Sequence, residues 1–292
     1  MNYKDIELHV GDFRDLLPIK DVQTFIIDPP YNVNYNYHRE NDKQRYKANS
    51  SDNLSDQEYK QFYADLLDKT YESSKDDASL FLINTPLNTF EQYETVKNSK
   101  WLYNQTIHWV YPNNMGRTTY RFTPSTRYIT WLVKDLKNYK RYIERLYQPY
   151  KEDSKKTRAQ KAKGRYGANL YDWWHINIVK NVSSEKVKYV NQLPRELLDR
   201  LIIATTDYGD LVADANCGTA SAMLASHRLG RASWGCDIND ELFKLWVDQL
   251  EKLEISETEV LYNCHSHLST TDMDDVDLEV LINVGTGIKD VG

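Results

Sequence analysis

Residues 24–31, with the sequence TFIIDPPY, place a short apolar, β-branched run directly before a carboxylate, two prolines and a tyrosine. An apolar run of this kind predicts a buried strand. Proline has no backbone N–H to donate to a sheet, so the strand has to end where the prolines begin. We therefore expect Asp28 at the carboxyl end of a strand and Tyr31 in the loop beyond it.

Strand and helix signals alternate on both sides of this stretch. Strands are expected at residues 6–10, 24–27, 79–83, 106–111, 128–133, 211–213 and 232–236. Helices are expected after Ser55 (in a capping box with Glu58), from Pro194, over residues 219–229 and after Asn239. This alternation predicts an α/β fold with a mostly parallel sheet and helices on both faces. Functional sites in such folds lie at the carboxyl ends of the strands.

The DPPY stretch carries a specific chemistry. The Asp28 carboxylate and the Pro29 carbonyl are two acceptors that a rigid turn can aim at one exocyclic amine. The ring of Tyr31 can stack on a planar base. These parts suit methylation of an amino nitrogen on a base flipped out of a duplex. An ordinary strand end with a tight turn is the alternative interpretation.

A second candidate site lies at residues 214–220, DANCGTA, between a strand and a helix. Small residues let a ligand approach the backbone, and a helix N-terminus favours a negative group. The next strand ends at Asp237, and an acid at about that offset typically accepts hydrogen bonds from ribose hydroxyls. Together they predict half of a nucleoside-cofactor site, with ordinary strand–helix packing as the alternative.

Composition narrows the class of protein. The chain has 292 residues, 40% hydrophobic and 27% charged, as in ordinary globular proteins. It has no run of about 18 apolar residues and no visible signal peptide, so a membrane span and export are not expected. Three cysteines favour a reducing cytoplasm. Cys264, His265 and His267 are too close in sequence to surround one tetrahedral ion easily, so we expect no metal site.

Charge is distributed unevenly along the chain. The net charge is −6, yet residues 134–165 contain twelve Lys or Arg and four Asp or Glu, a net of +8, which leaves −14 on the remainder. A basic segment on an acidic body can concentrate phosphate binding, although a solvated charged insertion is the plainer interpretation. The residues expected to contact phosphates are Lys155, Lys156, Arg158, Lys161 and Arg165.

In their order along the chain, these motifs resemble the β-group DNA amino-methyltransferases of restriction–modification systems, which use S-adenosylmethionine. In that group the DPPY-type motif precedes the target-recognition region, and the cofactor loop follows. The resemblance covers roughly residues 5–254. Its further supporting segments are Gly11-Asp12, IHWVYPN (107–113), QPY (148–150), LYDWWHI (170–176), NQLP (191–194) and GRASWGCD (230–237).

The resemblance implies a Rossmann-like, mostly parallel sheet of seven strands with a basic target-recognition insertion. Residues 1–134 would form the catalytic half with DPPY, 135–170 the insertion, 171–255 the cofactor-binding half and 256–292 an acidic tail. Double-stranded DNA would be the partner, and a homodimer and a cognate restriction endonuclease are compatible with the family.

The resemblance also implies roles for individual residues. Asp28, Pro29, Pro30 and Tyr31 would form the catalytic motif, holding the target amine and stacking on the flipped base. Asp12 would bind the cofactor's adenine amine, Gln192 would lie near its methionine carboxylate, and Asp237 would take its ribose hydroxyls. The loop along the cofactor's methionine part would supply Asp214, Asn216, Cys217, Gly218 and Thr219.

The chain departs from the family pattern at the cofactor loop, which is usually D-P-F-x-G-S-G-T. Ala215, Asn216 and Ala220 replace the Pro, the Phe and the second Gly, and Leu193 replaces the lysine of the family's Gln-Lys-Pro. Asp at the first position of DPPY goes mostly with adenine, so the expected reaction is N6-adenine methylation. The alternatives are N4-cytosine methylation, a DNA-binding protein with an impaired cofactor site, and methylation of RNA or of a protein glutamine.

Overall fold

The computed structural model describes residues 2–3, 5–32, 53–114, 119–151, 153–181, 183–187 and 191–251. The expected acidic tail, the NCHSH segment and most of the polar stretch after Tyr31 lie outside these ranges. Within the described ranges, no helix is both long enough and apolar enough to cross a membrane. The same residues contain no cluster of His, Cys, Asp or Glu side chains that could hold a metal ion.

A nine-stranded sheet forms the centre of the described part of the molecule, in the order β1-β2-β11-β10-β3-β4-β6-β5-β9. Its strands are β1 (Asn2–Tyr3), β2 (Ile6–Val10), β3 (Val22–Ile27), β4 (Ser74–Asn84), β5 (Leu102–Val110), β6 (Thr126–Val133), β9 (Trp173–His175), β10 (Leu211–Asp214) and β11 (Ala232–Asp237). Only β1 and β6 run antiparallel to their neighbours. The mostly parallel sheet is thus confirmed. The seven expected strands make up its body, and the short β1 and β9 extend its two edges.

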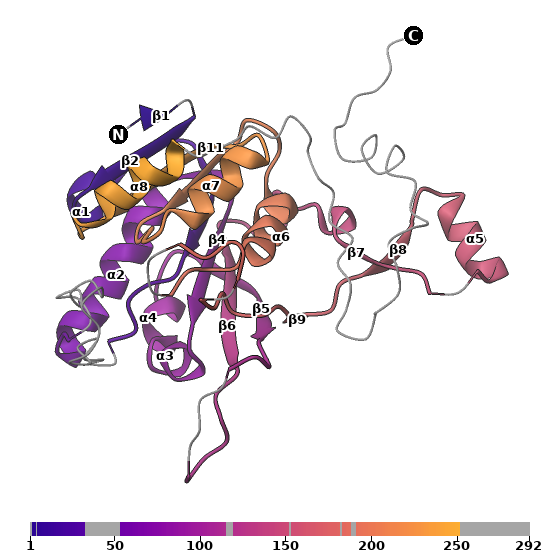
Figure 1. Ribbon diagram of the computed structural model, residues 1–292, viewed down its shortest axis with the longest axis horizontal. Coiled ribbons are helices and arrows are strands. Elements are labelled where there is room, and N and C mark those ends of the chain that lie inside the picture. Colours follow the sequence, from indigo (N-terminus) through magenta and orange to yellow (C-terminus); the bar gives the residue numbers. More distant parts are fainter. Residues whose placement is uncertain are drawn as a thin grey trace.

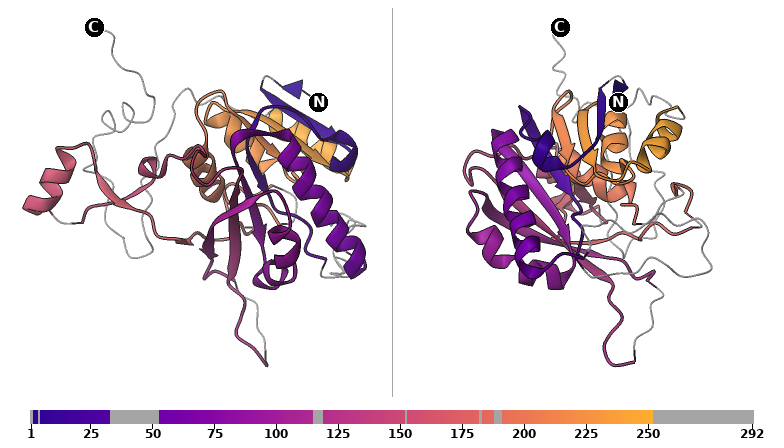
Figure 2. Two further views of the ribbon diagram at one scale, coloured as in Figure 1. Left: turned by 180° about the vertical axis from the view of Figure 1, so that it is seen from behind. Right: turned by 90° about the vertical axis from the view of Figure 1, so that its left-hand side faces the viewer.

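Helices cover both faces of the sheet, as the alternating pattern predicts (Figure 2). The helices of the described residues are α1 (Phe13–Leu16), α2 (Asp56–Ser73), α3 (Pro86–Glu91), α4 (Tyr93–Lys97), α6 (Arg195–Thr205), α7 (Ser221–Arg228) and α8 (Leu242–Leu250), a 3₁₀ turn, η2, at Ile143–Arg145, and α5 (Lys155–Lys161), which lies apart from the sheet. Residues of α6, α7 and α8 share one apolar core with the sheet. Residues of α1 and α2 share the second core on the opposite face.

Helix starts agree with local sequence signals in some places and not in others. The predicted capping box of Ser55 and Glu58 begins α2. The expected start at Thr219 is two residues early, because Ala220 adopts a left-handed conformation (φ 56°) and α7 begins at Ser221. Asn239 does not cap the last helix. Its side chain accepts a hydrogen bond from the Glu241 N–H within a turn, and α8 begins only at Leu242.

The direction of β6 brings a long connection to the functional edge of the sheet. β6 pairs antiparallel with β4, with Asn84 opposite Tyr128, so β6 begins where the parallel strands end. The connection from β5 to β6, residues 111–125, therefore leaves from the carboxyl edge of the sheet. The described residues 119–125 of this connection extend away from the body below β6 in Figure 1.

The predicted insertion is partly joined to the body. The Tyr142 N–H donates to the Ala204 carbonyl at 2.7 Å, and Lys140 and Arg145 form ion pairs with Asp207. Beyond this point, β7 (Tyr147–Pro149) and β8 (Gly167–Asn169) form a two-stranded sheet that carries α5. The unit from β7 to β8 projects to one side of the main sheet (Figure 1). Gly167 is required there, because a Cβ on it would lie 2.2 Å from the Gln148 carbonyl oxygen.

Candidate active site

Three carboxylates follow or end three adjacent strands at one edge of the sheet. Asp28 follows β3, Asp214 ends β10, and Asp237 ends β11; β3, β10 and β11 are neighbouring parallel strands. Parallel strands end at the same edge, so these acids, far apart in the sequence, are brought to one side of the molecule. The structure thus groups the ends of the two motifs that the sequence singled out.

The DPPY segment is held by side chains from several elements. The Tyr31 hydroxyl donates a short hydrogen bond to Oδ1 of Asp28. The Tyr59 hydroxyl, on α2, donates to the Pro30 carbonyl at 2.6 Å. The Asn88 amide, on α3, donates to the Tyr31 carbonyl at 2.9 Å and to the Tyr59 hydroxyl at 3.0 Å. The backbone after Asp28 is therefore fixed from two helices, and the Tyr31 ring is turned toward Asp28.

Arg127 is a site residue that the sequence reasoning missed. Its Nε donates to the Tyr31 hydroxyl at 3.3 Å, and its Nη1 donates to the Tyr111 hydroxyl at 2.7 Å. The guanidinium carbon lies 5.1 Å from the centre of the Tyr31 ring, within cation–π range. Its one sequence signal is a cation at the start of an otherwise apolar strand, and the sequence alone does not indicate that this strand runs antiparallel.

The environment of Asp28 changes its acidity. Burial raises the pKa of Asp28 to about 6, and the Tyr31 hydrogen bond and the Arg127 charge only partly oppose that rise. Burial, followed by the nearby Asp28 charge, holds the pKa of Tyr31 well above its usual range. Near neutral pH the neutral phenol of Tyr31 therefore contacts both the ionised carboxylate of Asp28 and the guanidinium of Arg127.

The cofactor loop is organised mainly through backbone groups. Oδ1 of Asp214 accepts from the Asn216 N–H at 2.9 Å, and Oδ2 of Asp237 accepts from the Gly218 N–H at 3.0 Å. From α8, Nε1 of Trp246 donates to the Gly218 carbonyl at 2.8 Å. Gly218 adopts a left-handed conformation (φ 46°), which glycine does without strain.

Electrostatics and burial in this loop suit a ligand with hydrogen-bond donors. Burial, followed by the charges of Asp28 and Asp237, raises the pKa of Asp214 well above its usual range. The side-chain oxygen Oδ1 of Asn216 is buried and has no hydrogen-bond partner among the described residues. Each carboxylate oxygen can accept more than one hydrogen bond. The oxygen atoms of Asp214, Asp237 and Asn216 at this edge could accept from the hydroxyl and amino groups of a nucleoside.

Asp12 and Gln192, two further expected cofactor residues, each form hydrogen bonds within their own segment. Asp12 caps α1, and Nη2 of Arg14 reaches Oδ2 of Asp12 at 2.6 Å. The Gln192 amide donates to the Glu185 carbonyl at 2.7 Å. The Gly11 N–H donates to the Asp237 carbonyl at 2.9 Å, so Asp12 lies close to the end of β11. The cofactor roles of Asp12 and Gln192 stay predictions.

The basic residues divide into two groups. Lys134, Lys140 and Arg145 bond to carbonyls or carboxylates of the body. The five predicted DNA contacts, by contrast, are all exposed, four of them on α5 and one after it: Lys155, Lys156, Arg158, Lys161 and Arg165. The positive charge available to a phosphate backbone is therefore concentrated on the projecting unit.

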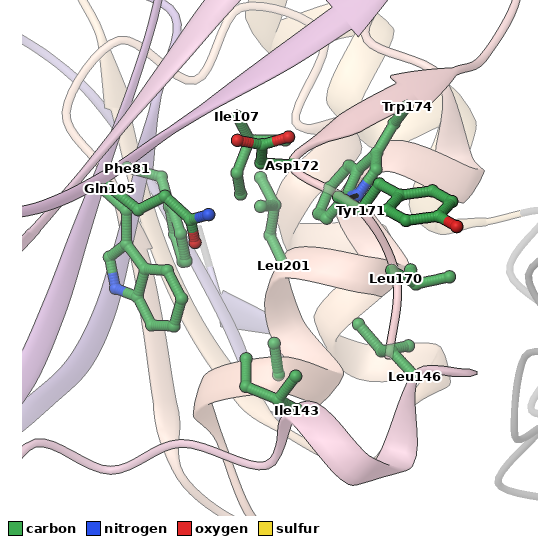
Figure 3. A pocket seen from close by; sticks show the side chains of 12 residues that line it. Phe81, Gln105, Ile107, Ile143, Leu146, Leu170, Tyr171, Asp172, Trp174 and Leu201 are labelled. Carbon is green, nitrogen blue, oxygen red and sulfur yellow. Dashed lines mark hydrogen bonds between the residues drawn. The ribbon is translucent and has the colours of Figure 1, made fainter. Parts of the chain in front are cut away.

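Two of the cavities in the described part lie away from the ends of β3, β10 and β11. A small one of about 70 Å³ sits between the sheet and α6, with the side chains of Phe81, Ile107 and Leu201 in its wall (Figure 3). A larger one of about 610 Å³ is lined from α3, α4 and β4 to β6, including Tyr93 and Trp101. Neither is lined by a residue of the DPPY segment or of the cofactor loop.

The strand order and helix-covered faces define the class of this protein as a Rossmann-like methyltransferase fold. Among solved structures, it is similar to the PvuII DNA methyltransferase (cytosine-N4-specific), with a TM-score of 0.61 and 13% identity, covering 88% of this chain and 93% of that one. It is also similar to the M1.HpyAVI–SAM complex, with a TM-score of 0.57 and 17% identity, covering 84% and 98%.

The sequence comparisons identify the family. The model of the DNA methylase family (N6_N4_Mtase) matches residues 22–248, and the chain belongs to this family. A curated relative is the type II methyltransferase M1.MboII of Moraxella bovis, 26% identical over 265 residues that cover 86% of this chain and 97% of that protein. The resemblance inferred from the order of the motifs is thereby confirmed, as a DNA methyltransferase of the N6/N4 family.

Proposed function

We propose that this DNA methyltransferase transfers a methyl group to the N6 amine of an adenine flipped out of duplex DNA. The observation that carries the proposal is the DPPY segment at the carboxyl end of β3, where the Asp28 carboxylate lies beside the cofactor-loop acid Asp214 in electrostatic range. Asp at the first position of this motif favours adenine within the family.

The catalytic motif acts by holding the amine. The Asp28 carboxylate and the Pro29 carbonyl accept its two hydrogens, so the nitrogen lone pair points away from them toward the methyl donor. Tyr31 leaves the Asp28 carboxylate and stacks on the base. The bond from Tyr59 to the Pro30 carbonyl keeps the backbone in place during this change. Asp28 has to be ionised, because it accepts a hydrogen bond first from the Tyr31 hydroxyl and then from the amine that takes the place of that hydroxyl.

S-adenosylmethionine supplies an already activated sulfonium methyl group, so no strong base is required before attack. Asp237 would accept from its ribose hydroxyls, and Asp214, Asn216 and Gly218 would hold its methionine part. The buried, unpartnered oxygen of Asn216 supports this assignment, because it can accept from a donor group of the cofactor. Cys217 and Thr219 contribute backbone: the Cys217 N–H donates to the Cys236 carbonyl, and the Thr219 carbonyl accepts from Gln249 on α8.

Duplex DNA is the macromolecular partner in this proposal. The exposed cations of α5 and Arg165 contact phosphates, and the unit from β7 to β8 carries target recognition. A homodimer, a cognate restriction endonuclease and a cytoplasmic location stay predictions from the family resemblance.

N4-cytosine methylation is the second candidate. The specific observation in its favour is the solved neighbour whose title gives it as cytosine-N4-specific, with a TM-score of 0.61. Both reactions need an exocyclic amine beside a carboxylate and a carbonyl, so the same mechanism serves either base. The difference lies in the groups that surround the base ring.

The test is methyl transfer onto unmethylated genomic DNA, followed by digestion and nucleoside mass spectrometry. We expect N6-methyladenine. N4-methylcytosine would replace the adenine assignment and keep the mechanism. If folded protein with ample S-adenosylmethionine yields no methylated nucleoside, the proposal is wrong and the chain is a DNA-binding member of the family without catalysis.

A further inference from the structure

In the connection between β5 and β6, the described residues 119–122, called the tip, display aromatic side chains. The Phe122 side chain is 99% exposed and the Tyr120 side chain 84% exposed. Large apolar rings are normally buried, because their exposure to water is unfavourable. Two such rings on a narrow projection, away from either core, indicate a surface that meets a partner.

This connection is joined at its base to the catalytic segment. The Tyr111 N–H donates to the Ser125 carbonyl at 2.9 Å, and the Asn114 amide donates to the Pro124 carbonyl at 2.5 Å, which closes the neck. Tyr111, which is buried, also accepts from Arg127 at 2.7 Å, and Arg127 reaches the Tyr31 hydroxyl at 3.3 Å. The exposed tip therefore stands on a rigid base that touches the residue proposed to stack on the target.

The chemistry of the tip fits a nucleic acid. Arg121 lies between the two rings in sequence, and its guanidinium carbon is 5.8 Å from the centre of the Tyr120 ring. The tip thus combines aromatic faces, which can stack on any base, with a cation near the phosphates. A protein that flips a base leaves a gap in the stack, and apolar side chains of DNA-binding proteins can insert between base steps.

We propose that Phe122, supported by Tyr120, is a wedge that enters the base stack of duplex DNA beside the flipped target. This inference rests on the proposed function, since it assigns the wedge to the same base-flipping reaction. The loop leaves from the edge where β3 ends, so a duplex positioned for the DPPY segment passes the tip. A wedge of this kind acts on a duplex and has no role on a single strand, whose bases are already free.

The first experiment exploits that difference. Phe122→Ala is compared with wild type for methyl transfer to native and to heat-denatured unmethylated genomic DNA. We expect kcat/KM on native DNA to fall about 10- to 100-fold, as stacking losses typically do, and kcat/KM on denatured DNA to change by less than about 2-fold. Phe122→Trp should restore most of the loss on native DNA.

Phe90→Ala is the matched control, because Phe90 on α3 is an aromatic side chain of similar exposure, 81%, on another element. Its kcat/KM on native DNA should equal that of wild type. Equal losses on native and denatured DNA for Phe122→Ala, or no loss on either, would overturn the wedge.

A second readout does not depend on methyl transfer. The photo-cross-linking residue p-benzoylphenylalanine is placed at position 122 or at position 90 of the full chain, which is irradiated with plasmid DNA and S-adenosylmethionine. Protein–DNA cross-links from position 122 and none from position 90 support the wedge, even where the assignment of the methylated base fails. Cross-links between two copies of the chain would instead show that the tip is a subunit interface, and cross-links to neither would likewise overturn the proposal.

Discussion

The DPPY segment after β3 and the cofactor loop after β10 meet at one edge of the sheet but are held in different ways. The DPPY segment is fixed by side chains from other elements: Tyr59, Asn88 and Arg127. The cofactor loop is held largely through its own N–H and carbonyl groups. A loop held by its backbone tolerates changes in its side chains, because any residue supplies the same donors and acceptors. This difference explains how the cofactor loop departs from the family pattern while DPPY does not.

In the DPPY segment, removal of the Asp28 carboxylate should have the largest effect on methyl transfer. Asp28→Ala loses the charged acceptor for the target amine, so methyl transfer should fall by about 10³-fold or more. The thermal unfolding temperature should stay unchanged or rise slightly, because the side chain is a carboxylate whose burial is unfavourable. Asp68→Ala, an exposed acid on α2, serves as the control. If Asp28→Ala transfers methyl groups at the wild-type rate, the DPPY segment is not part of the catalytic site.

In the cofactor loop region, Asp237→Asn should weaken the binding of S-adenosylmethionine without changing the affinity for DNA. The variant keeps one carbonyl oxygen to accept from the loop but loses the charge that favours hydroxyl donors. The Kd for S-adenosylmethionine, measured by isothermal titration calorimetry, should rise about 10- to 100-fold. Affinity for duplex DNA, measured by fluorescence anisotropy, should stay as in wild type. An unchanged Kd for the cofactor would contradict the ribose role.

Arg127→Gln tests whether a residue far away in sequence controls the acid of the DPPY segment. The pKa of Asp28 is about 6, and the charges that face it are Arg127, Tyr31 when ionised, and Asp214. Since the reaction needs ionised Asp28, kcat/KM should decline as the pH falls through about 6.

Loss of the Arg127 charge disfavours ionisation of Asp28, so the decline should move to higher pH. At pH 6 the variant should then be about 3- to 10-fold slower than wild type, in addition to any loss seen at high pH. Arg127→Lys keeps the charge and should keep the pH of the decline. If Arg127→Gln lowers kcat/KM by the same factor at every pH, Arg127 has a structural role only.

Asn216→Ala should have the smallest effect on cofactor binding. It should change protein stability and cofactor affinity in opposite directions. The buried amide oxygen of Asn216 has no partner in the described part of the chain, and its removal should stabilise the cofactor-free protein by about 1 kcal/mol in chemical denaturation. The same change should weaken S-adenosylmethionine binding about 5- to 10-fold, because it removes an acceptor. The Asn216 N–H that donates to Asp214 is kept in this variant. If stability rises and cofactor affinity does not fall, the oxygen is a strained group and not a ligand.

The sequence predicted the strands and the ends of the motifs well. All six residues of β3 are buried and four of them are apolar, and two prolines follow the strand, so the position of Asp28 follows from neighbouring residues. The start of α2 likewise follows from the Ser55 and Glu58 pair. The start of the last helix could not be predicted from Asn239 alone, because that side chain caps a turn three residues before the helix. Local signals identify an element more reliably than they identify its first residue.

Only the tertiary structure decided which side chains surround the proposed catalytic acid. Arg127 contacts Tyr31 across 96 residues of sequence, and this contact exists because β6 pairs antiparallel with β4 in one register. The same pairing carries Phe122 to the edge where the proposed target would bind. The sequence determined which residues end strands, since apolar runs and missing N–H groups act over a few neighbouring positions. The partners of those residues depend on strand order and register, which are set by packing of the whole sheet.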